Sequence, residues 1–355
     1  MVAISRQQDY IAAVCRELAM RLPSLQDEPI DTIYFGGGTP SLINCEALGE
    51  VFRTIDQYRP GAVKHCMEIT LEANPDDLSE AYVQALSQLP VNRLSIGIQS
   101  FHDTTLQLIG RRHTSRQAIE AVRRCQAYGL SNISIDLIFG LPGETLADWE
   151  YNLQQALALE VKHISAYHLT YEEGTRLWKM YEEGIVEPVD EEFSVEAFRL
   201  LRQQLIGAGY EHYEISNFAL PGYHSRHNSS YWQGKRYIGV GPGAHSYDGT
   251  TRQWNLSDLT AYLDASDSGI VPHEKELLTA EDRYNDQIIT ELRTSQGIDL
   301  VRLMNEHGDK YHAYCLCQAK PHLQTGRLAC DEERYLHLTP DSIMISDAIM
   351  RDLIY

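Results

Sequence analysis

Residues suited to ligand binding are concentrated in four short segments that contain glycine, proline or a carboxylate. Each segment follows a run of β-branched or aromatic residues, so each is predicted to leave the end of a strand. Glycine in such a loop lets backbone amides approach a ligand closely. The four segments are Gly36-Gly37-Gly38-Thr39-Pro40, Glu72-Ala73-Asn74-Pro75, Gln99-Ser100-Phe101 and Asp136-Leu137-Ile138-Phe139-Gly140-Leu141-Pro142.

Alternation of side chains within three predicted strands places polar residues on one face and apolar residues on the other. The apolar face is expected to pack against helices, while Glu72, Gln99 and Asp136 point inward at the carboxyl ends of the strands. A buried polar group left unsatisfied costs about 1–3 kcal/mol. These three residues therefore need hydrogen-bond partners. We favour a bound ligand as the partner over hydrogen bonds among the three residues themselves. The inward set is Glu68, Thr70, Glu72, Ser95, Gly97, Gln99, Ser134 and Asp136.

Residues 6 to about 215 alternate amphipathic helices with short apolar strands, a pattern typical of a parallel α/β sheet or barrel. Asp76 or Asp77 is expected to cap the third helix, and Thr114 and Thr145 to begin the next two. The pattern predicts helices at 11–22, 46–58, 76–89, 114–128, 145–159 and 194–205. It predicts strands at 32–35, 67–72, 93–99, 133–136 and 163–167, with a sixth strand at 210–215.

The first predicted element is a helix, although βα units begin with a strand. The sheet then has either an open edge near Tyr34, which proteins usually cover, or an N-terminal strand missing from this reading frame. The predicted fold is a partial (β/α) barrel, similar to a TIM barrel, over residues 1–215. An extension over 216–275 is expected to pack on it, and 276–355 to form a small, mainly helical unit resembling a winged helix, with a hairpin at 328–338.

The composition limits the classes of function. The 355 residues are 43% hydrophobic and 23% charged, which is enough to bury a large core. A net charge of -20 and a pI near 5.1 argue against a nucleic-acid surface, because phosphate backbones are bound mainly through clustered Lys and Arg. No apolar stretch is long enough to cross a membrane, and residues 1–6 lack the apolar segment of a signal peptide, so a cytoplasmic location is expected.

The seven cysteines are irregularly spaced, which favours reduced thiols over disulfides. Cys315 and Cys317, with His312 and Cys330 nearby, could form a metal site, but we favour a helix with incidental thiols. The full set is Cys15, Cys45, Cys66, Cys125, Cys315, Cys317 and Cys330.

Together, the four loop segments resemble radical S-adenosylmethionine proteins of the oxygen-independent coproporphyrinogen III oxidase type. Two further segments, 212–219 and His227-Asn228-Ser229-Ser230-Tyr231-Trp232, are similar to the haem-chaperone branch of that family. The resemblance runs from about residue 8 to the C-terminus. It implies haem and S-adenosylmethionine as ligands, and a 4Fe-4S cluster.

Carried onto this sequence, the resemblance assigns S-adenosylmethionine contacts to Gly37, Gly38, Thr39, Glu72, Gln99, Arg111 and Asp136. For Arg111 the alternative is a surface helix charge next to Arg112. The resemblance makes His227 the haem-iron ligand, and a neutral imidazole beside Tyr231 and Trp232 suits an iron porphyrin. His224 and His245 are the rival ligands, and no residue is assigned a catalytic role.

The family's C-x3-C-x2-C loop, which supplies three thiolates to the cluster, has no counterpart in this sequence. Cys15 lies within the first predicted helix and cannot replace it, because one thiolate does not hold a cluster. We favour a start codon placed at an internal Met over a paralogue without a cluster. In either case this chain as written is not expected to cleave S-adenosylmethionine.

The leading hypothesis is a chaperone that binds haem and passes it to an acceptor protein, with transient contact if that acceptor lies in a membrane. The alternative is an enzyme, an oxygen-independent coproporphyrinogen III oxidase. A third hypothesis is an inert folded remnant. The HNxxYW segment favours the first.

Overall fold

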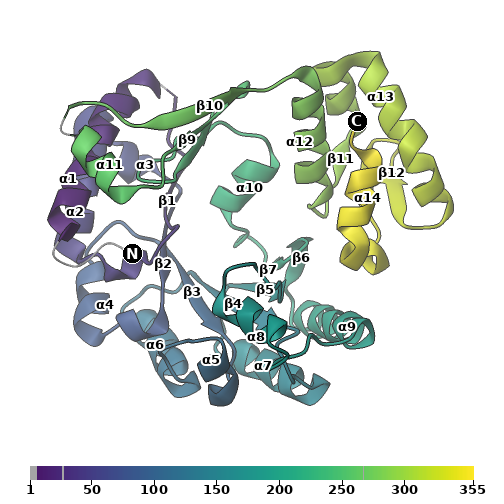
Figure 1. Cartoon of the computed structure of the whole chain (residues 1–355), viewed down its shortest axis with the longest axis horizontal. Coiled ribbons are helices and arrows are strands. Elements are labelled where there is room, and N and C mark those ends of the chain that lie inside the picture. Colours follow the sequence, from purple (N-terminus) through teal and green to yellow (C-terminus); the bar gives the residue numbers. More distant parts are fainter. Residues whose placement is uncertain (1–5, 26–27, 267) are drawn as a thin grey trace.

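The computed structural model describes residues 6–25, 28–266 and 268–355 (Figure 1). Its main feature is a curled seven-stranded sheet with the order β1-β2-β3-β4-β5-β7-β6. The strands are β1 (Thr32–Phe35), β2 (Glu68–Ala73), β3 (Arg93–Gln99), β4 (Ile133–Phe139), β5 (His163–His168), β6 (Glu211–Glu214) and β7 (Asn217–Ala219).

Strands β1 to β5 are parallel, which confirms the α/β half-barrel. The sixth strand departs from the expectation, because β7 pairs antiparallel with β5, and β6 pairs antiparallel with β7 and bridges to Thr294 through Glu214. The chain therefore turns back as a hairpin instead of continuing the parallel order. β7 has three residues, all buried, including Asn217, so it lacks the long apolar run by which a strand is predicted.

Helices cover the outer face of the sheet, and their buried side chains join those of the strands in one large core. Thr114 and Thr145 begin their helices with capping boxes, as expected. The cap expected at Asp76 or Asp77 is wrong: Ser79 caps that helix, and both aspartates pair with Arg112. The covering helices are α2 (Cys45–Tyr58), α4 (Glu80–Leu86), α6 (Ser115–Ala127), α7 (Leu146–Ala158) and α9 (Glu191–Gly207).

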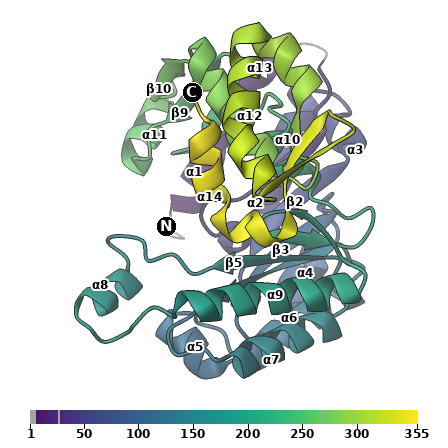
Figure 2. The same ribbon diagram turned by 90° about the vertical axis from the view of Figure 1, so that its right-hand side faces the viewer.

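Three short helices in the region up to residue 215 escape prediction: α3 (Ala62–His65), α5 (Asp103–Leu108) and α8 (Arg176–Glu182). They are four to seven residues long, too short to show a helical repeat of apolar residues. Figure 2 shows α8 projecting from the body of the molecule.

Strand β1 forms the edge of the sheet. Within the described part of the chain it pairs with β2 alone, so the edge near Tyr34 is unpaired there. Whether a further N-terminal strand belongs beside it stays a prediction. Helix α1 (Gln7–Arg21) lies beside this edge and packs against α2 and α11 (Leu259–Ser266).

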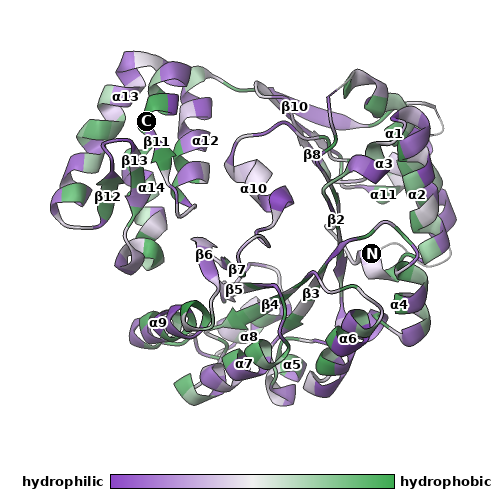
Figure 3. Ribbon diagram, turned by 180° about the vertical axis from the view of Figure 1, so that it is seen from behind, coloured by the Kyte–Doolittle hydropathy of each residue, from purple (hydrophilic) through white to green (hydrophobic). Residues whose placement is uncertain are grey.

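Residues 226–277 contain α10 (Arg226–Trp232) and a second sheet of β8 (His245–Tyr247), β9 (Thr251–Asn255) and β10 (His273–Leu277). Helix α10, which the sequence pattern does not predict, carries the HNxxYW segment. Ser225 caps this helix by accepting a hydrogen bond from the amide of Asn228. Figure 3 shows β3 and β4 largely hydrophobic, and α10 hydrophilic to intermediate, inside the curve of the sheet.

The C-terminal region has a separate core built from three helices and a small sheet, as expected from the sequence. Helix α13 changes direction at Gly308, whose φ of 79° is not helical. In the described ranges no helix is long and apolar enough to cross a membrane. The elements are α12 (Ala280–Leu292), α13 (Leu300–Gln324), α14 (Ser346–Leu353), β11 (Ile298–Asp299), β12 (Leu328–Asp331) and β13 (Tyr335–Leu338).

Candidate functional site

Helix α10 is held inside the half-barrel by the carboxylate of Glu68, a buried residue of β2. This carboxylate accepts hydrogen bonds from the amides of Arg226 and His227, both at 2.9 Å, and from the Ser225 hydroxyl at 3.4 Å. A negative charge at the first turn of a helix satisfies amides that have no partner within the helix. Glu68 therefore sets the position of the HNxxYW residues relative to the sheet.

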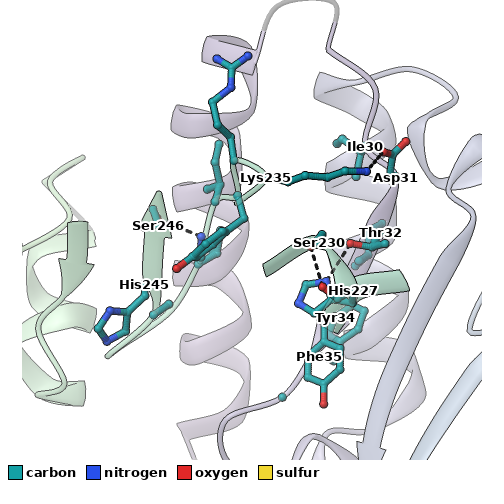
Figure 4. Close-up of a pocket in the computed structure, with 18 of the residues that line it drawn as sticks. Ile30, Asp31, Thr32, Tyr34, Phe35, His227, Ser230, Lys235, His245 and Ser246 are labelled. Atoms are coloured by element: carbon teal, nitrogen blue, oxygen red, sulfur yellow. Dashed lines mark hydrogen bonds and ion pairs between the residues drawn. The ribbon is translucent and has the colours of Figure 1, made fainter. Parts of the chain in front are cut away.

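The imidazole of His227 makes three contacts that orient it. Its ring stacks on Tyr34 of β1, with centroids 4.6 Å apart and planes 14° apart. Nδ1 lies 2.8 Å from the Thr32 hydroxyl, and Nε2 lies 2.9 Å from the Tyr231 hydroxyl. Figure 4 shows the ring against Thr32 and Tyr34, with His245 on the opposite side of the cavity.

Burial lowers the pKa of His227 to about 4, so the ring is neutral at pH 7. One ring nitrogen of a neutral imidazole donates a hydrogen bond and the other accepts. Hydroxyl groups can do either, so the contacts with Thr32 and Tyr231 are compatible with both tautomers. A neutral imidazole is the form that ligates iron.

A cavity of about 1340 Å³ lies beside α10, between the open edge of β1, helix α1 and residues 235–248. It exceeds the roughly 300–1,000 Å³ of a typical small-molecule pocket. Its lining combines aliphatic and aromatic side chains with the three candidate histidines, His224, His227 and His245. The apolar part of the lining includes Val14, Leu18, Leu22, Ile33, Phe35, Tyr231 and Trp232.

The two rival histidines differ from His227 in their surroundings. His224 Nε2 lies at hydrogen-bond distance, 2.7 Å, from a carboxylate oxygen of Glu211, and its ring stacks on Tyr213, so this nitrogen is already engaged. His245 is exposed on β8 and stacks near Trp254. His227 alone of the three contacts β1 through Thr32 and Tyr34.

The glycine loop after β1 is fastened to β2 through Glu72. This carboxylate accepts a hydrogen bond from the Tyr34 hydroxyl at 2.6 Å and another from the amide of Gly37 at 3.2 Å. Gly36 has no room for a side chain, since a Cβ there would lie 2.4 Å from the Tyr34 ring and 2.9 Å from Glu72. Gly37 and Gly38 are exposed with open space around them, so a ligand can approach their backbones, although the Gly37 amide already donates to Glu72.

Gln99 and Arg111 meet at the carboxyl end of β3. Gln99 has a φ of 72°, a strained conformation for a residue other than glycine, of the kind that occurs at functional sites. Arg111 donates to the Asn74 side chain at 2.8 Å and to the Gly97 carbonyl at 2.7 Å. Arg111 therefore turns toward the strand ends, whereas its neighbour Arg112 lies at the surface.

Asp136 faces the same interior from β4. Burial raises its pKa to about 6, even though hydrogen bonds with Ser165 and Ser95 and the charge of Arg93 act in the opposite direction. The nearby carboxylate of Glu72 raises it further. The structure thus brings together the strand ends that carry Gly37, Gly38, Thr39, Glu72, Gln99, Arg111 and Asp136, while His227 lies on the other side of Tyr34.

Three residues of the site were not assigned their roles from the sequence. Thr32 and Tyr34 contact His227. The two-residue alternation of side chains along their short strand is the signal that places both on the inner face. Glu68 was placed inward, but its contact with residues 225–227 lies about 160 positions away in the chain, where local pattern carries no signal.

The described cysteines do not form a metal centre. All seven are free, and within the described part of the chain no three His, Cys, Asp or Glu side chains are grouped to hold a metal ion. Cys315 is buried and Cys317 exposed, so the two side chains do not converge.

Comparison with known proteins identifies the family. Residues 5–156 match the model of the radical SAM superfamily. The heme chaperone HemW of Bacillus subtilis is 33% identical over 302 residues, which cover 84% of this chain and 79% of that protein. The chain belongs to the HemW family. HemW of Mycobacterium tuberculosis is 30% identical over 97% of this chain and 86% of its own length.

The fold comparison agrees with this family. Coproporphyrinogen III oxidase (HemN) from Escherichia coli, a radical SAM enzyme, superimposes with a TM-score of 0.81 over 100% of this chain and 85% of its own. At 18% sequence identity this likeness concerns the fold. The two sequence relatives named above are heme chaperones, so the comparisons favour the chaperone hypothesis over the oxidase.

Proposed function

We propose that this chain binds haem in the cavity beside α10, with His227 as the iron ligand, and passes the haem to an acceptor protein. The observation that carries the proposal is the placement of His227, a neutral imidazole on the wall of a large, partly apolar cavity. Haem is a wide apolar disc with a metal centre and two carboxylates, and this lining suits the disc.

Iron ligation through Nε2 needs a lone pair on that nitrogen. In the tautomer with a proton on Nδ1, the ring donates to Thr32 Oγ1, and Nε2 accepts a hydrogen bond from Tyr231. The Tyr231 hydroxyl then occupies the direction in which the iron would lie. Haem binding through this nitrogen requires that hydroxyl to move aside, while Thr32 and Tyr34 keep the ring in place.

S-adenosylmethionine is proposed to bind at the carboxyl ends of β1 to β4. The contacts proposed are the backbones of Gly37 and Gly38 with Thr39, and the side chains of Glu72, Gln99, Arg111 and Asp136. The two carboxylates suit an ammonium group and hydroxyl groups, and exposed backbone amides suit a carboxylate. The open space at Gly37 and Gly38 supports this assignment.

The 4Fe-4S cluster of radical SAM proteins does not fit the cysteines described here, so no reaction step is assigned to it. The haem acceptor is proposed to be a protein, with transient contact if it lies in a membrane. A location in the cytoplasm and the division of the chain at about residues 215 and 275 remain proposals.

A haem titration followed at the Soret band tests the proposal. The wild-type chain is expected to shift the band, and His227→Ala to lose the shift or weaken binding at least tenfold. His224→Ala and His245→Ala are matched controls, because both histidines line the same cavity. An unchanged titration of His227→Ala, or loss of the shift in either control instead, would refute His227 as the ligand.

A further inference from the structure

Arg93 is a buried cation without a partner. It begins β3 on the inner face of the half-barrel and is only 3% exposed. Its guanidinium makes no hydrogen bond and no ion pair of 4 Å or less with any residue that the structure describes, and its Nε is fully buried. A buried charge is costly unless it is paired, so a residue of this kind is expected where an anion binds.

A second unsatisfied group lies next to Arg93. Thr70 of β2 is opposite Arg93 in the strand register, and Tyr34 of β1 is opposite Thr70. All three therefore lie in one row across the inner face. The Thr70 hydroxyl is fully buried and has no hydrogen-bond partner among the residues that the structure describes. Neither Arg93 nor Thr70 lines the cavity beside α10, although Tyr34 of the same row does. One small anionic group between the two would satisfy both.

The charge of Arg93 lowers the pKa of Asp136, but the acidic groups around Arg93 have closer hydrogen-bond partners than its guanidinium. The Glu68 carboxylate is engaged by the amides of Arg226 and His227 and by the Ser225 hydroxyl. Asp136 is held by Ser95 and Ser165. Both carboxylates lie beyond ion-pair distance of Arg93, although its charge is felt at Asp136 and at His227.

We propose that Arg93 and Thr70 form an anion subsite inside the half-barrel that takes a carboxylate group. A guanidinium binds a carboxylate through two parallel hydrogen bonds, and a hydroxyl adds a third. The carboxylate comes either from a haem propionate, in which case the inference rests on the proposed function, or from a free small carboxylate.

The first arm compares haem with haem dimethyl ester, whose propionates are blocked, by Soret titration. The wild-type chain is expected to prefer haem by about tenfold, and Arg93→Met and Thr70→Val to reduce this preference. Arg199→Met is the matched control, because Arg199 is 64% exposed on α9. If neither haem nor its dimethyl ester shifts the Soret band with the wild-type chain, the proposed function is refuted. The second arm then decides whether Arg93 and Thr70 bind a carboxylate.

The second arm measures thermal unfolding with and without acetate. Acetate is expected to raise the unfolding temperature of the wild type and Arg199→Met but not of Arg93→Met. This result, together with equal binding of haem and its ester, identifies a free carboxylate as the occupant. Without ligand, Arg93→Met is expected to unfold at the same or a higher temperature than the wild type, because an unpaired charge is removed.

Two results would overturn the proposal. One is an Arg93→Met variant that retains both the preference for haem over its ester and any stabilisation by acetate. The other is a ligand-free Arg93→Met variant that unfolds well below the wild type, which shows a structural role for the guanidinium. Arg93→Lys, which keeps the charge but loses the planar fork, is expected to retain the stability and to recover part of the binding.

Discussion

Tyr34 stacks its ring on the imidazole of His227, with centroids 4.6 Å apart. The hydroxyl of the same tyrosine donates to Glu72 at 2.6 Å. One side chain of β1 therefore connects the proposed haem ligand with the proposed S-adenosylmethionine site. The ring and the hydroxyl serve different sites, so the two roles can be separated by mutation.

Tyr34→Phe keeps the ring and removes the hydroxyl. We expect S-adenosylmethionine binding to weaken by about tenfold, because Glu72 loses a charge-assisted hydrogen bond that orients it. Haem affinity should change less than twofold. Tyr34→Leu removes the ring as well and should weaken both. Calorimetric titration with S-adenosylmethionine and Soret titration with haem measure the two effects, and equal loss of haem binding in both variants would contradict the separation.

Tyr231→Phe removes the hydroxyl that engages Nε2 of His227. Because haem no longer has to displace this hydrogen bond, its affinity should rise by about three- to tenfold in a Soret titration. Tyr237→Phe is the control, since Tyr237 lines the same cavity and packs edge-on against Tyr231. Weaker haem binding in Tyr231→Phe would show that the hydroxyl assists ligation.

Gly36→Ala and Gly38→Ala test the loop after β1. A Cβ at Gly36 would collide with Tyr34 and Glu72, whereas one at Gly38 would meet no atom within 4 Å. Gly36→Ala should therefore lower the free energy of unfolding by about 1–3 kcal/mol and disturb S-adenosylmethionine binding. Gly38→Ala should fold as the wild type does. Urea unfolding of the two variants checks the contrast, and equal stability would show that the loop shifts freely.

The pH dependence of stability should carry the signature of His227. Its pKa is about 4 in the folded chain against 6.5 when unperturbed. Between these values the unfolded chain binds a proton that the folded chain does not, so the free energy of unfolding rises with pH across this window. The contribution is at most about 3 kcal/mol.

The measurement is urea unfolding of the wild type and His227→Gln from pH 4 to 7. Other groups contribute in the window, and Asp136, whose pKa is raised to about 6, acts with the opposite sign. The difference in the free energy of unfolding between the wild type and His227→Gln isolates the contribution of His227. This difference should increase in favour of the wild type up to about pH 6.5. A difference that stays constant with pH would contradict the lowered pKa.

Local pattern predicted much of the half-barrel correctly. The bounds of β3, the caps at Thr114 and Thr145 and the inward alternation of Glu72 and Asp136 all agree with the structure. These features depend on neighbours in the chain, namely the two-residue repeat of a strand and the first turn of a helix. The roles of the site residues as ligand contacts stay predictions.

The sequence by itself determined the family, the parallel α/β sheet and the loops that gather at its carboxyl edge. Only the tertiary structure decided that His227 lies on a helix, that Thr32 and Tyr34 hold its ring, and that Glu68 anchors that helix. Thr32 and His227 are 195 residues apart. Contacts of that kind arise from how the chain folds back into the half-barrel, and spacing along the sequence carries no signal for them.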